Sequence, residues 1–272
     1  MNEREYNEAE GIRRSDLWKM EESPERFKYF LEHPVEQTPA MAFGSAAHKL
    51  FLEPRDFGEE YAVAPNVDRR TKSGREEWES FQAANEGKTI LANDDLDTIH
   101  EMGVALINCP LAYKLIFGKK GQSEVPIFWT DKKTGEKCKA KMDRVVTYRR
   151  RKYIVDYKTT MAADTFHFNS EVWKRGYYMQ AAMYAEGMKT ALKLRRLPGF
   201  LFVAQEKKPP YSVNVIEVSE EVMNAGIAKF HSLLEKYHAC SVLDKWPGYV
   251  QDVPNDCFVP GWMMSEMEDE FE

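Results

Sequence analysis

Two strand-like segments joined by a short basic turn constrain the fold of this chain more than any other feature. Residues 136–148 (EKCKAKMDRVVTY) and 152–160 (KYIVDYKTT) flank a turn that we place at 149–150. Segments of this kind around a short turn predict a β-hairpin. Each strand also carries an acid, Asp143 or Asp156, among residues that are otherwise typical of a sheet.

The turn position sets how these two acids face each other. Asp143 and Asp156 each lie six residues from the turn, so a hairpin closed at 149–150 places them on opposite positions. Their Cα atoms would then be about 4.5–5.5 Å apart, with both side chains on one face. Lys158 is two residues beyond Asp156 and shares its face. A register slip of one residue would put the acids on opposite faces instead.

Facing carboxylates repel each other, so the arrangement requires a compensating charge. Mg²⁺ supplies one, because it binds carboxylate oxygens and keeps several waters. A cation between Asp143 and Asp156, with Lys158 beside it, is the apparatus expected for phosphodiester hydrolysis. Ordinary ion pairs are the alternative interpretation, with Asp143 bound to Arg144 and Asp156 to Lys158. The opposed position of Asp143 favours the catalytic interpretation.

The rest of the pattern predicts helices first and further strands later. A helix with Ser23 as its N-cap ends before Pro34. Further helical patterns cover 38–54, 73–87, 93–108, 109–118, 170–192 and Ser219 to about Cys240, and strand patterns cover 123–131, 199–207 and 211–219. This order predicts an α/β fold in which helices flank a mixed central β-sheet, preceded by a helical N-terminal part.

Length and composition predict one large domain. The chain has 272 residues, of which 43% are hydrophobic, enough for a substantial core. We expect residues 1–118 to be mainly helical, 119–240 to hold the catalytic sheet and helices, and 241–272 to form an irregular acidic tail. The formal net charge of −6 does not indicate a nucleic-acid binder, but basic residues crowd 132–158, so a local basic face is expected.

Several classes of protein are disfavoured by what the sequence lacks. The four cysteines are scattered and form no CxxC pair, which excludes a zinc ribbon and a thioredoxin motif. The polar, acidic N-terminus does not resemble a signal peptide, and no apolar run is long enough to cross a membrane. No GxxxxGK[ST] phosphate loop is present, so the chain carries no motor of its own. These features predict a cytoplasmic protein without a membrane partner.

Four motifs, in order, resemble a known family. MDRVV (142–146) followed by IVDYKTT (154–160) resembles the paired motifs of the PD-(D/E)xK nuclease superfamily, and GSAAHKLFLEP (44–54) resembles the histidine-bearing helix of its RecB-like branch. QAAMY (180–184) resembles the Q-x-x-x-Y motif that follows the catalytic strands. Together with the opening at 15–34, the arrangement is most similar to exonuclease VIII-type phage and prophage recombination exonucleases. The resemblance covers about residues 11–234 and implies a restriction-endonuclease-like core.

Site roles follow from this resemblance residue by residue. It implies that His48, Asp143 and Asp156 are metal ligands, that the backbone carbonyl of Tyr157 completes the coordination, and that Lys158 is the catalytic lysine. A lone histidine among small residues is otherwise more typical of a core position, so only the matched acids make His48 a candidate ligand.

The resemblance also assigns the helix after the strands. Gln180 and Tyr184 would hold the lysine region or the DNA near the scissile phosphate, and their i,i+4 spacing puts them on one helix face. Glu124, in the strand before Asp143, is a candidate auxiliary acid. Met142 stands where the family's proline would be, a position that the RecB-like branch keeps loosely. Trp173, Tyr177 and Tyr178 could stack on bases, although core packing is the better interpretation for at least two of them.

The expected function is that of a metal-dependent exodeoxyribonuclease. The resemblance implies degradation of double-stranded DNA from its ends, 5′ to 3′, leaving 3′ single strands for homologous recombination. It further implies Mg²⁺, with Mn²⁺ as a substitute, a homo-oligomeric ring, and a single-strand annealing protein as partner. No iron–sulfur cluster is expected, because Cys240 and Cys257 do not form a tight cysteine group. A non-catalytic DNA-binding module and a structure-specific endonuclease are the alternatives.

Overall fold

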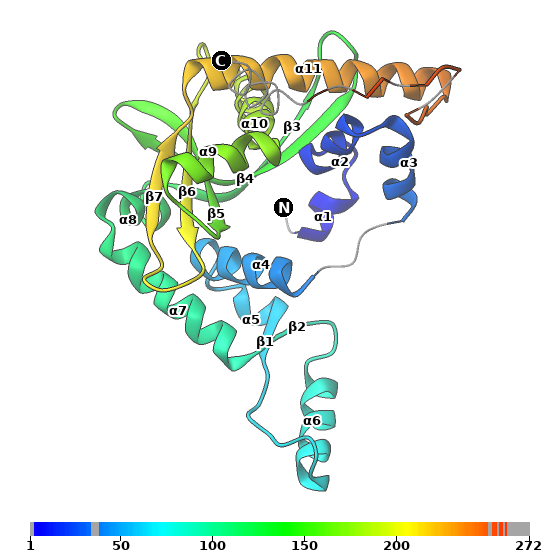
Figure 1. Cartoon of the computed structure of the whole chain (residues 1–272). Helices are drawn as coiled ribbons and strands as arrows, with labels where there is room; N and C mark the ends of the chain where they lie inside the picture. The colour runs from blue at the N-terminus through cyan, green and yellow to red at the C-terminus, as the bar shows by residue number, and fades with distance from the viewer. Residues whose placement is uncertain (1–2, 34–37, 250–251, 255, 258, 260–272) are drawn as a thin grey trace, which may run out of the picture.

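The fold centres on a five-stranded mixed sheet in a computed structural model that describes residues 3–33, 38–249, 252–254, 256–257 and 259 (Figure 1). The strands are β3 (Gln122–Thr130), β4 (Lys137–Tyr148), β5 (Arg151–Thr160), β6 (Gly199–Glu206) and β7 (Val213–Glu217), in that spatial order. Neighbouring strands are antiparallel except for β5 and β6, which are parallel. The predicted α/β fold with a mixed central sheet is therefore confirmed.

The β4–β5 hairpin has the predicted register. Its turn residues Arg149 and Arg150 have φ values of 45° and 63°, as the tight turns that match the twist of a hairpin require. Paired positions run from Tyr148–Arg151 to Arg144–Val155. These pairs confirm the predicted register up to one position short of Asp143 and Asp156, so the pairing of the two acids is not itself part of the ladder.

Alternate residues of the sheet face two separate cores. Ile154, Phe200 and Phe202 contribute to the first core, whereas Val155, Leu201 and Val203 contribute to the second. The first core packs against α2 (Arg14–Trp18), α10 (Tyr177–Ala191) and α11 (Glu220–Leu243), and the second against α4 (Pro39–Leu52), α7 (Asn93–Asn108) and α8 (Pro110–Ile116). Helices thus cover both faces of the sheet.

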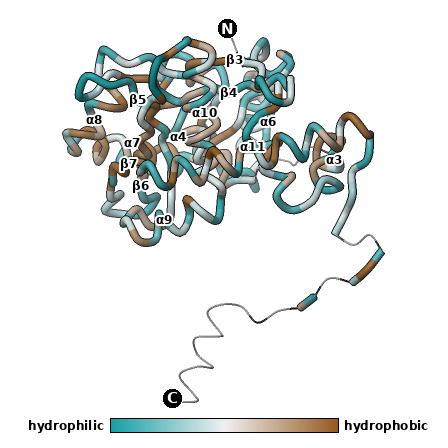
Figure 2. Tube along the Cα trace, turned by 90° about the horizontal axis from the view of Figure 1, so that it is seen from above, coloured by the Kyte–Doolittle hydropathy of each residue, from teal (hydrophilic) through white to brown (hydrophobic). Residues whose placement is uncertain are grey.

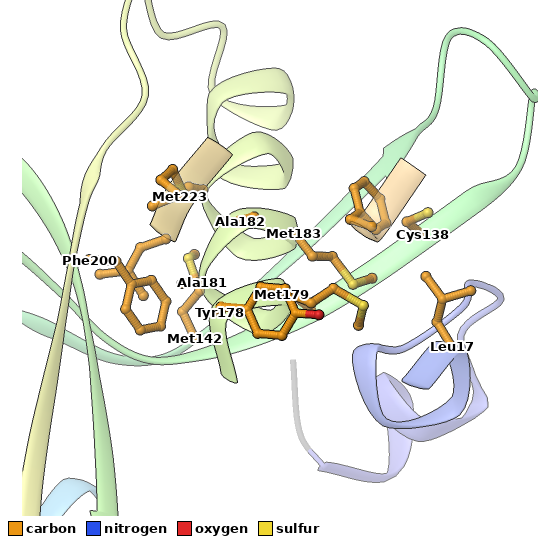
Figure 3. Close-up of a cluster of buried hydrophobic side chains, with 14 of the residues drawn as sticks. Leu17, Cys138, Met142, Tyr178, Met179, Ala181, Ala182, Met183, Phe200 and Met223 are labelled. Carbon is orange, nitrogen blue, oxygen red and sulfur yellow. The ribbon is translucent and has the colours of Figure 1, made fainter. Parts of the chain in front are cut away.

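Methionine is prominent where α10 meets the first core. Met179 and Met183 are fully buried, and Figure 3 shows both directed toward Leu17 and Cys138. A flexible thioether fills irregular gaps between elements that meet at different angles. The short N-terminal helices are held against the sheet through this contact.

The remaining elements are short or lie outside the sheet. They are α1 (Glu3–Glu8), the 3₁₀ helix η1 (Lys19–Glu21), α3 (Pro24–Glu32), α5 (Phe57–Glu60), α6 (Lys72–Ala84), α9 (Thr165–Lys174), and the parallel pair β1 (Tyr61–Val63) and β2 (Thr89–Leu91). The β1–β2 pair was not predicted, because strands of three residues leave little periodicity to detect. Helix α6 projects from the body as an arm (Figure 1).

The helical pattern at 170–192 is two helices in the structure. Helix α9 ends at Lys174 and α10 begins at Tyr177, with Gly176 between them at a φ of 63°. A Cβ on Gly176 would lie 2.5 Å from ring carbons of Trp18. Glycine therefore allows both the left-handed backbone and the close approach of α2.

Helix ends largely follow the predicted caps. Ser23 accepts from the Arg26 amide and Ser219 from the Val222 amide, as N-caps do. Helix α11 continues to Leu243, three residues beyond the expected end. The acidic stretch 265–272 lies outside the described residues.

Hydrophilic and hydrophobic residues are interspersed along the tube of Figure 2. In the described part of the chain, no helix combines the length and apolar character of a membrane span.

Candidate active site

The candidate site lies where β4 separates from β5. The ladder between them ends at Arg144–Val155, one position short of the two acids. Met142 and Val145 both belong to the first core although they are three residues apart, so the in-and-out alternation of β4 is broken between them. Such irregularities re-aim a side chain at functional sites, and here the re-aimed side chain is that of Asp143.

Asp143 is fixed by a histidine and by a backbone amide. His48 Nε2 lies 2.9 Å from Asp143 Oδ2, and the Tyr157 amide donates to the same oxygen at 2.8 Å. Helix α4 carries His48 to this point, after starting at Pro39 with Thr38 as its N-cap. The structure thus brings together His48, Asp143 and Tyr157, three of the residues that the sequence predicts for the site.

Glu124 joins this group from β3. Its Oε1 atom lies 3.6 Å from His48 Nδ1, and its Oε2 atom lies 2.8 Å from Lys141 Nζ. The backbone of Glu124 has a φ of 50°, an uncommon value for a non-glycine residue and one that clusters at functional sites. The left-handed backbone interrupts β3 beside Asp143 and directs the Glu124 carboxylate inward.

Three side chains offer donors for one metal ion. Ligand atoms of His48, Glu124 and Asp143 all lie within 4.8 Å of one another. Among the described residues, the buried Glu124 Oε1 atom has no hydrogen-bond partner, and Asp156 Oδ2 is paired with Lys158 Nζ at 2.5 Å. Carboxylate oxygens with one imidazole suit Mg²⁺ or Mn²⁺. The donor set and these two oxygens therefore fit a divalent cation.

Asp156 faces a different set of partners. It is 1% exposed, its Oδ2 lies 2.5 Å from Lys158 Nζ, and its Oδ1 accepts from Gln180 Nε2 at 2.5 Å. Asp156 is not in the three-donor group around His48. The structure thus places the predicted residues Asp156, Lys158 and Gln180 together, directly beside the three-donor group.

The two acids of the hairpin have pKa values shifted in opposite directions. Burial raises the pKa of Asp156, Asp143 raises it further, and Lys158 only partly opposes them, so that it reaches about 6. Burial also acts to raise the pKa of Asp143, but His48, Lys158 and the Tyr157 amide outweigh it and lower the pKa. Neighbouring carboxylates with separated pKa values are typical of functional sites.

The basic groups of the site are stabilised in their charged forms. Burial acts to lower the pKa of His48, but Asp143 and Glu124 raise it to about 9. Burial likewise opposes the charge of Lys158, and the two aspartates outweigh it, so its pKa is raised. Burial raises the pKa of Glu124. A cation that binds here would replace the proton on His48, since a metal ligand must be the neutral imidazole.

Tyr184 lies one turn beyond Gln180 on α10, as predicted. Burial raises its pKa, and Asp156 and Asp143 raise it further, so its hydroxyl is protonated and can donate a hydrogen bond. Its predicted role has no further support from the contacts.

Arg14 and Lys141 belong to the site but were missed from the sequence. The Arg14 guanidinium lies 5.6 Å from the Trp18 ring centroid and 5.7 Å from that of Tyr177, and donates to the Arg175 carbonyl. No sequence pattern marks Arg14. Strand alternation could have identified Lys141, because it is two residues before Asp143.

A cavity of about 720 Å³ unites these groups. Its walls include Arg14, His48, Glu124, Asp143, Lys158 and Gln180. The basic residues 149–152 are not part of it, because six strand residues separate the hairpin tip from the acids, roughly 20 Å at about 3.3 Å per residue. The cations at this cavity therefore come from elsewhere in the chain.

Comparisons with known proteins agree on the fold. A family model described as "PDDEXK-like domain of unknown function (DUF3799)" matches residues 14–254. The crystal structure of a "Putative exonuclease" from Eubacterium rectale is similar with a TM-score of 0.61 at 14% identity, over 94% of this chain and 96% of that chain. At this identity the likeness shows the fold alone.

Other matches add little. The structure of SSO0001 has a TM-score of 0.32 at 15% identity, over 73% of this chain and 94% of that chain, too low to indicate a shared fold. No curated protein matches the chain.

Proposed function

Because the chain belongs to the family of PDDEXK-like domains (DUF3799), we propose that it is a nuclease that hydrolyses DNA with a divalent cation. The observation that carries the proposal is the juxtaposition of two groups. The donors of His48, Glu124 and Asp143 lie within 4.8 Å of one another, next to the buried pair of Asp156 and Lys158. A core packed only for stability has no reason to gather three acids beside one another.

Each of these residues has a role that its position supports. His48, Glu124 and Asp143 would hold the cation, and Asp156 would contribute Oδ2, the oxygen that is paired with Lys158 in this structure. When bound, the cation would neutralise phosphate charge and activate water. This set extends the predicted ligands by Glu124, and the Tyr157 carbonyl stays a predicted ligand.

The remaining groups would act on the substrate or on other side chains. The Lys158 ammonium is held by Asp156, so it is in place to stabilise charge that develops on the phosphate. Gln180 fixes Asp156 by donating to its second oxygen. Arg14 lines the same cavity and would pair with a phosphate, as guanidinium groups commonly do.

The finer activity that we propose is exonucleolytic. Degradation of double-stranded DNA from its ends, 5′ to 3′, is supported by the resemblance of the motifs to exonuclease VIII-type enzymes and by the word "exonuclease" attached to the neighbour from Eubacterium rectale. A role in recombination, a ring-shaped homo-oligomer, an annealing-protein partner, a cytoplasmic location and Mg²⁺ as the ion are proposals on the same resemblance.

Linear and closed circular DNA, incubated with Mg²⁺ or with EDTA, test the proposal. Release of nucleotides from linear DNA alone is the expected result, and a label at the 5′ or 3′ end gives the polarity. Cleavage of closed circular DNA would contradict the exonuclease proposal and indicate an endonuclease. Binding without cleavage in Mg²⁺ and in Mn²⁺ would replace both by a DNA-binding module.

A further inference from the structure

A second cavity opens next to the candidate active site. Its volume is about 470 Å³, and it lies between the start of α4, the end of β5 and helix α9. Lys158, Thr159 and Tyr177 line both this cavity and that of the site. The two cavities therefore adjoin each other at the end of β5 and the start of α10.

The lining of the second cavity is positively charged. It includes four cations, Lys158, Lys174, Arg175 and Lys207, against one acid, Glu171. Glu171 is paired with Arg175 and Lys158 with Asp156, so Lys174 and Lys207 set the sign of the charge. This local excess contrasts with the net charge of −6 for the whole chain. An anionic ligand is the complement of such a surface.

Large apolar side chains are exposed at the same place. Met41 and Met161 line the cavity and are 53% and 64% exposed. Phe166, in the first turn of α9, is 82% exposed, and its ring lies 5.5 Å from that of His167, which also lines the cavity. Exposed apolar side chains that gather beside a cavity indicate a binding surface.

We propose that this cavity binds one unpaired nucleotide of the cleaved strand, adjacent to the scissile phosphate. Its base would contact Met41 and Met161 in the cavity and stack on Phe166, which lies beside the lining residue His167, and its phosphate would pair with Lys174 and Lys207. A volume of about 470 Å³ is in the range of small-ligand pockets, which suits a nucleotide and not a duplex. Cations along the backbone with an aromatic ring for the base are the general means of binding single strands. This inference rests on the proposed nuclease function.

Stacking and phosphate pairing can be tested separately on the full chain. A single-stranded oligonucleotide carrying 2-aminopurine is titrated in Ca²⁺, which we expect to support binding and little cleavage. Phe166→Ala is compared with Tyr113→Ala, a matched control because Tyr113 is 49% exposed on α8. Lys174→Ala and Lys207→Ala are compared with Lys132→Ala, an exposed lysine in the β3–β4 turn. Each variant is also assayed for cleavage of linear duplex in Mg²⁺.

The expected result is quenching of 2-aminopurine by the wild type and by both controls. Phe166→Ala should lose the quenching and bind about fivefold or more weakly, the smallest effect typical of lost base stacking. Lys174→Ala and Lys207→Ala should bind more weakly in low salt and show a shallower dependence on salt.

Two other outcomes would overturn the inference. In the first, the wild type cleaves linear duplex, but the three variants show unchanged quenching and unchanged affinity. This result would contradict the nucleotide subsite and would agree with the proposed nuclease function. In the second, the variants bind closed circular duplex and the single strand more weakly by the same factor. This result would mean that the cavity contacts paired DNA, which contradicts the proposal of an unpaired nucleotide. Absence of cleavage by the wild type, in contrast, contradicts the proposed function itself.

Discussion

Replacing Lys158 with methionine separates the chemistry of the candidate site from its stability. The change removes the ammonium group that lies 2.5 Å from Asp156 Oδ2 and keeps an unbranched side chain that is one atom shorter. Loss of one preorganised group that stabilises transition-state charge typically lowers kcat about 10²–10³-fold. We therefore expect Lys158→Met to cleave DNA at least about 100-fold more slowly, while DNA binding is largely retained.

The stability effect of the same change is limited by proton uptake. Folding raises the pKa of Asp156 from 3.8 to about 6, so stability is lost as the pH rises through this window. The penalty at pH 7 is about 3 kcal/mol, at about 1.4 kcal/mol per pH unit. Without Lys158 the pKa of Asp156 rises further. If Asp156 stays protonated at pH 7 in the folded protein, the loss of folding free energy is limited to about 4 kcal/mol, the cost of protonating the carboxylate at that pH. For Asp156 alone the added destabilisation is therefore about 1 kcal/mol, or roughly 2–4 °C in Tm, and Asp143, whose pKa Lys158 also lowers, adds to it.

The assay combines single-turnover cleavage of an end-labelled duplex with thermal unfolding of the metal-free protein at pH 7. Lys189→Met, an exposed lysine on α10, is the matched control and should match the wild type in both. Cleavage by Lys158→Met within about threefold of the wild-type rate would refute the role of the ammonium group. A Tm lower by more than about 10 °C would refute the stability argument, because proton uptake by Asp156 could not account for it.

Three further predictions address the metal site, the core and the thiols. In thermal unfolding, Mn²⁺ should raise the Tm of the wild type, with about 3 kcal/mol of stabilisation at a Mn²⁺ concentration of 100 times Kd. Asp143→Asn should abolish this rise, and an equal rise in both proteins would contradict the proposed metal site. Gly187→Ala should lower the free energy of unfolding by about 1–3 kcal/mol in urea, because its Cβ would lie 2.6 Å from the Trp129 ring; an unchanged midpoint would show that the ring moves aside. Cys138 should resist iodoacetamide in the folded protein, because burial raises its pKa to about 12, whereas the exposed Cys257 should react; mass spectrometry distinguishes the two sites.

Short-range patterns account for the parts of the fold that the sequence predicts correctly. The position of the turn at Arg149 and Arg150 fixes the hairpin register, which holds as far as Arg144–Val155. The i,i+4 spacing of Gln180 and Tyr184 holds because both lie within α10. Tyr178 is 7% exposed and Tyr177 packs on the first core, so core packing was the correct interpretation for these two rings.

Features that depend on tertiary contacts could not be predicted in this way. Nothing near Glu124 in the sequence indicates the left-handed backbone that this residue adopts beside the break in β4. In the sequence, Gly176 between α9 and α10 is compatible with a continuous helix. Its role depends on the contact with Trp18, which only the tertiary structure shows. Arg14 reaches the site only because α2 folds back onto α10. Gln180, which donates to Asp156, likewise lies 24 residues away, on a helix.

The residues of the candidate site are far apart in the sequence, so they are synthesised at different times. His48 leaves the ribosome first, Glu124 and Asp143 follow, and Gln180 comes after Asp156. An incomplete nascent chain therefore has the histidine without its acids, or the acids without the helix that fixes Asp156. If the proposed nuclease activity needs the complete site, we expect it to appear only after α10 has docked on the sheet and not in truncated chains.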